Sequence, residues 1–249
     1  MTTRSAVVQQ FVGLIAALLF AGNSWADIPS NGWRLGASRL IFDEGSTSAT
    51  LWITNTSDRP WMVTGAVLQT KDSGDMLEKT SERLLVNPPA ATVAPGKRHP
   101  VRLVWVGTSE PWPFKTEVME RLRLRLLPAK VATKNPDSSL QTDAVVYLKV
   151  FLRPKALVAP DGRTVPHRIE LACGSGTLTA KNRSAYWVTL RSLQSHGVEL
   201  ISADQPAPMV PPLKSLEFPV QTCEPPFQAI EINDAGFPVP LPLSERRAP

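Results

Sequence analysis

The segment at residues 118–127, VMERLRLRLL, constrains the fold more than any other part of this chain. Arginine and leucine alternate within it, at Arg121, Leu122, Arg123, Leu124, Arg125 and Leu126. A helix would scatter the arginines over several faces, whereas a strand places the three leucines on one side and the three arginines on the other. The pattern therefore predicts a strand with one buried face. The arginine face is typical of a solvated surface, and the alternative is a surface that meets an acidic partner.

Short strand-like segments separated by turns fill the rest of the chain. In Ser48–Asn55, apolar residues also recur at every second position. Loops are predicted at residues 71–83, 107–116 and 128–143. The 24 prolines favour strand ends and turns over long helices. The expected strands are residues 33–42, 48–55, 61–69, 84–86, 101–106, 118–127, 145–154, 168–171, 177–180, 187–190, 198–201, 216–220 and 229–232. This spacing predicts an all-β protein of two β-sandwiches in tandem. The turn at residues 159–162 separates the expected domains, residues 27–154 and 160–249.

The N-terminus has the pattern of a secretory signal peptide. Arg4 precedes an apolar run of 12 residues, 11–22, and small residues at Ser24 and Ala26 predict cleavage before Asp27. The expected location is therefore the periplasm, and no later apolar run is long enough to span a membrane. Removing residues 1–26 lowers the formal net charge from +5 to +4. The basic residues are spread along the chain, so no nucleic-acid partner is expected.

Few residues suggest catalysis or metal binding. Cys173 and Cys223 are the two cysteines, and in an exported protein an even pair favours a disulfide, with two buried free thiols as the alternative. The histidines share no ligand spacing with the cysteines, so no metal site is expected. Gly174-Ser175-Gly176 lacks the frame of a nucleophile elbow and is predicted to be a hairpin turn. We expect neither catalytic residues nor a cofactor, and no enzymatic activity.

Lys149 lies in the middle of the apolar strand predicted at residues 145–154, VVYLKVFLRP. A lysine at such a position costs desolvation free energy unless another group pairs with it. The strand alone favours the interpretation that Lys149 lies on the solvent side of a half-exposed strand, since buried lysines are rare. The alternative is a functional cation.

Several segments in order resemble the periplasmic chaperones of chaperone–usher pili, the PapD-like family. These segments are residues 38–42 (SRLIF), 55–61 (NTSDRPW), 87–89 (NPP), 102–103 (RL), 117–128, 148–154 (LKVFLRP), 178–188 (LTAKNRSAYWV) and 232–234 (IND). Each fragment is short, but together they are spread over nearly all of the mature chain. The chain departs from the family pattern at Ala235, Gly236 and Phe237, and Arg121 stands where the family usually has an aromatic residue. The cysteines do not lie on the last two strands of the first domain, so the chain resembles the short-loop branch or a divergent one.

The resemblance implies two immunoglobulin-like domains in an L-shaped arrangement and a function without ATP or cofactor. Such a chaperone binds a pilin subunit by lending an edge strand, and delivers it to an outer-membrane usher. The alternative is an immunoglobulin-like periplasmic binding module of another export or surface-assembly system.

The resemblance also assigns roles to residues. Arg39 and Lys149 match the two cations that bind the subunit's C-terminal carboxylate, which supports the functional interpretation of Lys149. Glu117, Arg153 and Asp234 match a salt-bridge set between the domains.

The donor strand is expected just before Lys149. Its apolar phase comprises Leu140, Thr142, Ala144, Val146 and Leu148. The opposite phase contains Asp143, whose charge would be costly in an apolar groove. The alternative is that residues 128–143 form only a loop.

Overall fold

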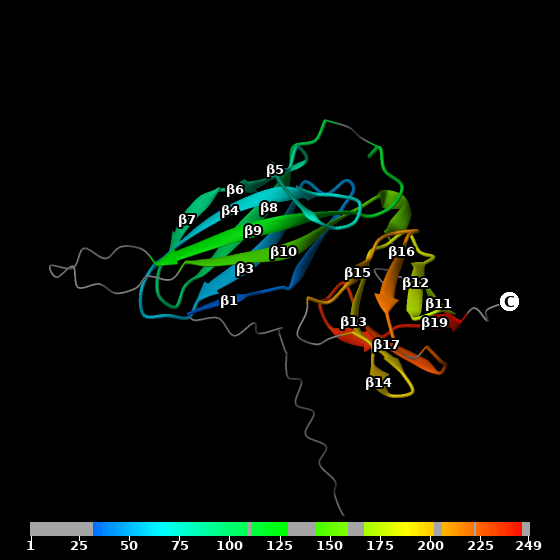
Figure 1. The fold of residues 1–249 in the computed structure, drawn as a ribbon. Coiled ribbons are helices and arrows are strands. Elements are labelled where there is room, and N and C mark those ends of the chain that lie inside the picture. The colour runs from blue at the N-terminus through cyan, green and yellow to red at the C-terminus, as the bar shows by residue number, and fades with distance from the viewer. Residues whose placement is uncertain are drawn as a thin grey trace, which may run out of the picture.

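The computed structural model describes residues 32–108, 111–128, 143–158, 167–201, 206–221 and 223–245. These residues form two sheet-rich domains, joined where β10 ends, whose strands run at a steep angle to each other (Figure 1). The elements are β1 (Trp33–Leu35), β2 (Arg39–Asp43), β3 (Ser48–Asn55), β4 (Trp61–Thr70), β5 (Met76–Thr80), β6 (Leu84–Asn87), β7 (Ala90–Val93), β8 (Arg98–Trp105), β9 (Val118–Pro128), β10 (Ala144–Arg153), the 3-10 turn η1 (Lys155–Leu157), β11 (Ile169–Gly174), β12 (Thr177–Asn182), β13 (Val188–Ser195), β14 (Val198–Glu199), β15 (Met209–Val210), β16 (Ser215–Pro219), β17 (Phe227–Ile232), β18 (Pro238–Pro240) and β19 (Leu243–Glu245).

The first domain is a sandwich of two sheets. One sheet has the strand order β1-β3-β8-β6, and the other has the order β2-β10-β9-β4-β5, with β7 also paired to β4. The leucines of β9, at positions 122, 124 and 126, are buried in the core between the sheets, and the arginines between them lie on the outer face. The alternation in residues 118–127 therefore determines which face of β9 is buried.

The segment predicted as one strand at residues 33–42 is two strands in different sheets. β1 pairs with β3, and β2 pairs in parallel with β10. The chain crosses between the sheets at Gly36, whose N–H donates to the carbonyl of Trp52 at 2.8 Å. A Cβ on Gly36 would lie 3.2 Å from that oxygen, so a side chain at this crossing would be crowded against the backbone of Trp52. The prediction of a single strand was wrong because both halves are apolar.

Two strands of the first domain were not predicted from the sequence. β5 lies within residues 71–83, where a loop was expected, and pairs with the end of β4. Its residues are exposed or half-buried, so it is an edge strand without an apolar phase to reveal it. β7 follows Pro88-Pro89 directly and pairs with the start of β4.

The second domain is also a sandwich. Its sheets have the orders β16-β12-β11-β19 and β14-β13-β17-β18, with β15 also paired to β13. β11 and β12 form an antiparallel hairpin around Gly174-Ser175-Gly176, as the sequence predicted, and Gly176 has a φ of +70°. The short strands β15, β18 and β19 were not predicted.

Both domains contain the same turn built on a buried asparagine. Asn55 donates from Nδ2 to the carbonyls of Arg59 and Val93, at 2.7 and 2.9 Å, and its Oδ1 accepts from Ser57. In the second domain, Asn182 donates to the carbonyl of Tyr186 at 2.7 Å and accepts from the residue two positions on. Each asparagine satisfies backbone groups that would otherwise be buried without a partner.

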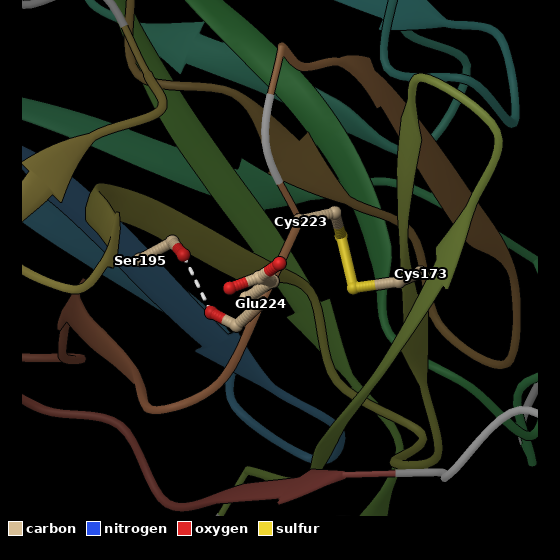
Figure 2. Close-up of a disulfide and its surroundings, with 4 residues drawn as sticks. All are labelled: Cys173, Ser195, Cys223 and Glu224. Carbon is tan, nitrogen blue, oxygen red and sulfur yellow. Dashed lines mark hydrogen bonds between the residues drawn. A yellow bond between two sulfur atoms is a disulfide. The ribbon is translucent and has the colours of Figure 1, made fainter.

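A disulfide joins Cys173 on β11 to Cys223, with 5.6 Å between their Cα atoms. Figure 2 shows the bond beside Glu224, whose carbonyl accepts a hydrogen bond from Ser195 at 2.5 Å. Both sulfurs pack against the core of the second domain. The disulfide expected from the sequence is therefore confirmed.

Replacing both cysteines by serine is expected to lower the free energy of unfolding by about 3–4 kcal/mol, because the bond closes a long loop in the unfolded chain. Denaturant unfolding without reductant measures the difference. The wild-type protein treated with reductant serves as a control and should unfold at the same denaturant concentration as the double variant. Equal stability of the oxidised wild type and the variant would contradict a stabilising role for the bond.

In the described part of the chain, no helix has the length and apolar character that crossing a bilayer requires. Among the same residues, no group of three or more His, Cys, Asp or Glu side chains could hold a metal ion. The predicted signal peptide, residues 1–26, and the predicted boundary turn at 159–162 lie outside the described residues.

Candidate functional site

Arg39 and Lys149 lie side by side on neighbouring strands. Arg39 begins β2 and Lys149 lies in the second half of β10, and the parallel register pairs these two residues directly. Paired positions on adjacent strands carry their side chains on the same face, about 5 Å apart. Two residues separated by 110 positions in the sequence thus form one cationic pair, on the face opposite the first core.

The second domain contacts both cations. Lys149 donates from Nζ to Thr189 Oγ1 on β13 at 3.3 Å. Arg39, which is 8% exposed, donates from Nη1 to the carbonyl of Ile232 on β17 at 2.9 Å, while its Nε is buried without a partner. The site therefore lies at the junction of the domains, with hydrogen-bond donors left over.

Burial lowers the pKa of both cations, and repulsion from neighbouring arginines adds to this for Lys149. Burial, together with the positive charges of Arg39 and Arg121, lowers the pKa of Lys149 to about 7. Burial also lowers the pKa of Arg39, against the charges of Asp234, Glu117 and Glu231. An anion bound here would relieve this repulsion and restore the ammonium form.

The first half of β10 is an open sheet edge. β9 pairs with Ala144–Leu152 along one side, whereas β2 pairs only with Lys149–Arg153 along the other. Within the described residues, no strand pairs with Ala144–Leu148 on the side away from β9. An unpaired edge of this kind can accept a strand from another chain. This open edge, residues 144–148, ends at the cationic pair.

The side chains of the open edge point in two directions. Val145 and Tyr147 are 46% and 42% exposed on the same face as Lys149. Ala144 and Val146 are half-buried against the first core, and Leu148 belongs to that core. The described residues expected to be donated to the subunit, Ala144, Val146 and Leu148, thus lie on the face of β10 that packs against the first core. Leu140 and Thr142 lie outside the described residues.

Arg153 joins the two domains through carboxylates. Its guanidinium donates from Nε to Glu117 at 2.7 Å, and from Nη1 and Nη2 to Asp234 at 2.7 and 3.0 Å. Glu117 accepts in addition from the backbone N–H of Trp187, at 2.9 Å. Burial opposes the charge on Arg153, but the hydrogen bonds that it donates to Asp234 and the charge of Glu117 outweigh burial and raise the pKa of Arg153. The three residues named from the sequence therefore lie together between the domains.

Apolar contacts surround these ion pairs. Met119, Phe151 and Trp187 form a small buried cluster that combines residues of both domains. On the far side of the junction, Gly236 approaches Ser38 so closely that a Cβ would lie 2.5 Å from the serine hydroxyl. Apolar contacts and ion pairs thus both join the two domains.

Sequence reasoning missed three residues of this junction. Thr189 and Trp187 contact Lys149 and Glu117, and nothing in their local sequence distinguishes them from core positions. Glu231 is buried and lies against the ring of His167. It immediately precedes the Ile-Asn-Asp segment, which was the one available signal.

Two family models cover most of the chain. Residues 32–158 match the N-terminal domain of PapD, described as a pili and flagellar-assembly chaperone, and residues 164–242 match the C-terminal domain of the pili assembly chaperone PapD. The chain belongs to the PapD-like chaperone family. The function suggested by the resemblance is thus confirmed at the level of a fimbrial or pilus assembly chaperone of the chaperone–usher pathway.

Curated relatives and solved structures are similar to this PapD-like chaperone over much of their length. The probable fimbrial chaperone ElfD of Escherichia coli is 28% identical over 188 residues, which is 75% of this chain and 76% of ElfD. Among solved structures, the SafB chaperone in complex with the SafA pilin of Salmonella enterica has a TM-score of 0.67 at 20% identity, over 86% of this chain and 96% of that one. The E. coli chaperone DraB has a TM-score of 0.66 at 21% identity, over 83% and 94%. These structures confirm the fold.

Proposed function

We propose that this chain binds pilin subunits in the periplasm by lending them the open edge of β10, and that it delivers them to an outer-membrane usher. The observation that carries the proposal is the position of the open edge, which ends at Arg39 and Lys149. The solved complex of a similar chaperone with a pilin supports it. The PapD-like family consists of non-enzymatic chaperones, and the proposal assigns this chain no reaction and no cofactor.

The subunit's last strand would pair with the backbone of residues 144–148. Ladder hydrogen bonds supply affinity that does not depend on side chains, and an exposed edge of the subunit is shielded from aggregation. Because Ala144 and Val146 already lie at the rim of the first core, a subunit bound there would extend that core. The subunit's terminal carboxylate would then reach Lys149 and Arg39, which form charge-assisted hydrogen bonds to it.

The cluster of Glu117, Arg153 and Asp234 would hold the domains at a fixed angle. Thr189 and the carbonyl of Ile232, both from the second domain, contact the two cations. A change in the angle would therefore move these contacts, so a rigid junction keeps the carboxylate site preorganised.

Co-expression tests the proposal. The protein is expressed with a pilin subunit encoded beside it, and the amount of soluble periplasmic subunit is compared with expression of the subunit alone. We expect soluble subunit only with the chaperone, in a complex of one copy each. A subunit level that does not depend on the chaperone would refute the proposed function.

Affinity for the subunit terminus is expected to fall as pH rises above 7. The pKa of Lys149 is about 7 in the free protein, and a bound carboxylate raises it. Binding is therefore full below pH 7 and weakens by up to about tenfold per pH unit above it, until the bound-state pKa is reached. Calorimetry at pH 8 in buffers of different ionisation enthalpy should show uptake of nearly one proton, and absence of uptake would contradict the assignment of Lys149.

Two substitutions just before β10 test which alternate side chains of the donor strand enter the groove of the subunit. Leu140→Asp is expected to weaken subunit capture, because a charge would enter an apolar groove, whereas Gln141→Asp on the opposite phase should not. Pull-down of a co-expressed subunit measures both variants. Equal tolerance of the two would place the start of the donor strand nearer Val145.

A further inference from the structure

Arg121 extends the cationic pair to a row of three. The antiparallel register of β9 and β10 pairs Arg121 with Lys149, on the side opposite Arg39. We call Arg39, Lys149 and Arg121 the cationic row. Neighbouring strands lie about 4.8 Å apart, so the backbones at the two ends of the row are about 10 Å apart. The side chain of Arg121 is half-buried, and no hydrogen bond or ion pair joins it to the described residues.

The carboxylates near the row are engaged with other groups. Glu117 and Asp234 bind Arg153, and Glu231 lies against His167. The negative charges of these three acids favour the protonated form of Arg39. Lys149 is instead affected by the positive charges of Arg39 and Arg121, which lower its pKa. Burial lowers the pKa of Arg121, and among the described residues no neighbouring charge offsets this. In this part of the chain, the Lys149–Arg121 half of the row therefore lacks a compensating negative charge.

One carboxylate is too small to neutralise the row. A carboxylate between Arg39 and Lys149 leaves the Arg121 guanidinium on the far side of Lys149. A partly buried guanidinium without a partner is costly, and a second anion there would be favourable.

We infer that the cationic row selects subunits whose last residue is Asp or Glu, with the α-carboxylate at Arg39 and Lys149 and the side-chain carboxylate at Lys149 and Arg121. The spacing of the row allows both carboxylates to come from one residue. This inference rests on the proposed function and names the chemistry of the partner's terminus.

The test uses two synthetic strand peptides that are identical except for a last residue of Glu or Gln, each with a free α-carboxylate. Fluorescence titration at low salt should show about tenfold tighter binding of the Glu peptide to the wild type. Arg121→Gln should bind both peptides with the affinity that the wild type has for the Gln peptide. Arg121→Lys retains a charge and should retain part of the preference. Arg123→Gln, a change two residues away on the same face, should retain all of it.

The outcomes separate this inference from the proposed function. If the wild type binds both peptides equally, or if Arg121→Gln keeps the preference, selection of an acidic terminus is refuted while capture by Lys149 stands. If Lys149→Ala binds both peptides as the wild type does, the proposed carboxylate site itself fails. The unfolding curve of Arg121→Gln shows that the variant is folded, so a lost preference reports the missing guanidinium.

Discussion

Replacing Lys149 by Met is expected to abolish capture of pilin subunits and to make the empty protein more stable. The folded protein holds an ammonium group between two arginines in a partly buried position, which lowers its pKa to about 7. Methionine has a similar length and no charge, so it removes the repulsion and the desolvation cost. Because solvent reaches this half-buried side chain, we expect a gain of only about 1–2 kcal/mol in the free energy of unfolding.

The pH dependence of stability gives an independent check. The pKa of Lys149 is lower in the folded state than in the unfolded state, so the unfolded chain binds more protons between pH 7 and about pH 10. Protonated Lys149 therefore lowers the free energy of unfolding by its full amount below pH 7. This loss of stability disappears as the pH rises from 7 to about 10. The gain from Lys149→Met should be largest below pH 7. Lys115→Met, at an exposed lysine, should change neither stability nor capture. A destabilised Lys149→Met variant would contradict the account.

Replacing Arg153 by Met is expected to destabilise the protein by about 3–5 kcal/mol, because it leaves the buried carboxylate of Glu117 without its partner. The junction should also loosen, since Asp234 loses its contact with the first domain. Chemical unfolding measures the stability, and small-angle X-ray scattering measures the spread of domain arrangements.

Two variants serve as controls for Arg153. Lys214→Met breaks an exposed ion pair with Asp72 that also joins the domains, and it should cost less than about 1 kcal/mol. The double variant Arg153→Met with Glu117→Leu removes the orphaned charge and should be more stable than Arg153→Met alone. If Arg153→Met unfolds like the wild type, the cluster does not stabilise the junction.

Sequence patterns predicted the strands whose one face is buried. β3 and residues 121–126 of β9 alternate, because each has the core on one side and solvent or the other domain on the other side. β5 is mostly exposed and therefore shows no apolar phase, so only its pairing with β4 reveals it. The sequence did not reveal that the chain passes from one sheet to the other at Gly36, because apolar residues lie on both sides of this glycine.

The candidate site could be predicted only in part. Lys149 was conspicuous because a charge inside an apolar strand needs a physical reason. Its pairing with Arg39 depends on a parallel register between segments far apart in the sequence, and the local pattern around Arg39 does not contain that information. Arg121 was seen as one of three equivalent arginines on β9. The resemblance marked it only as a departure from the family pattern, and the register with β10 places it beside Lys149.

Hydrogen exchange along β10 tests most directly whether the open edge receives a subunit. In the free protein, the backbone amides of residues 144–148 that point away from β9 should exchange fast. In a purified complex with a pilin subunit they should become protected, while those of β16, at the edge of a sheet in the second domain, should exchange as before. Unchanged exchange at residues 144–148 in a complex that has formed would show that the subunit is bound elsewhere.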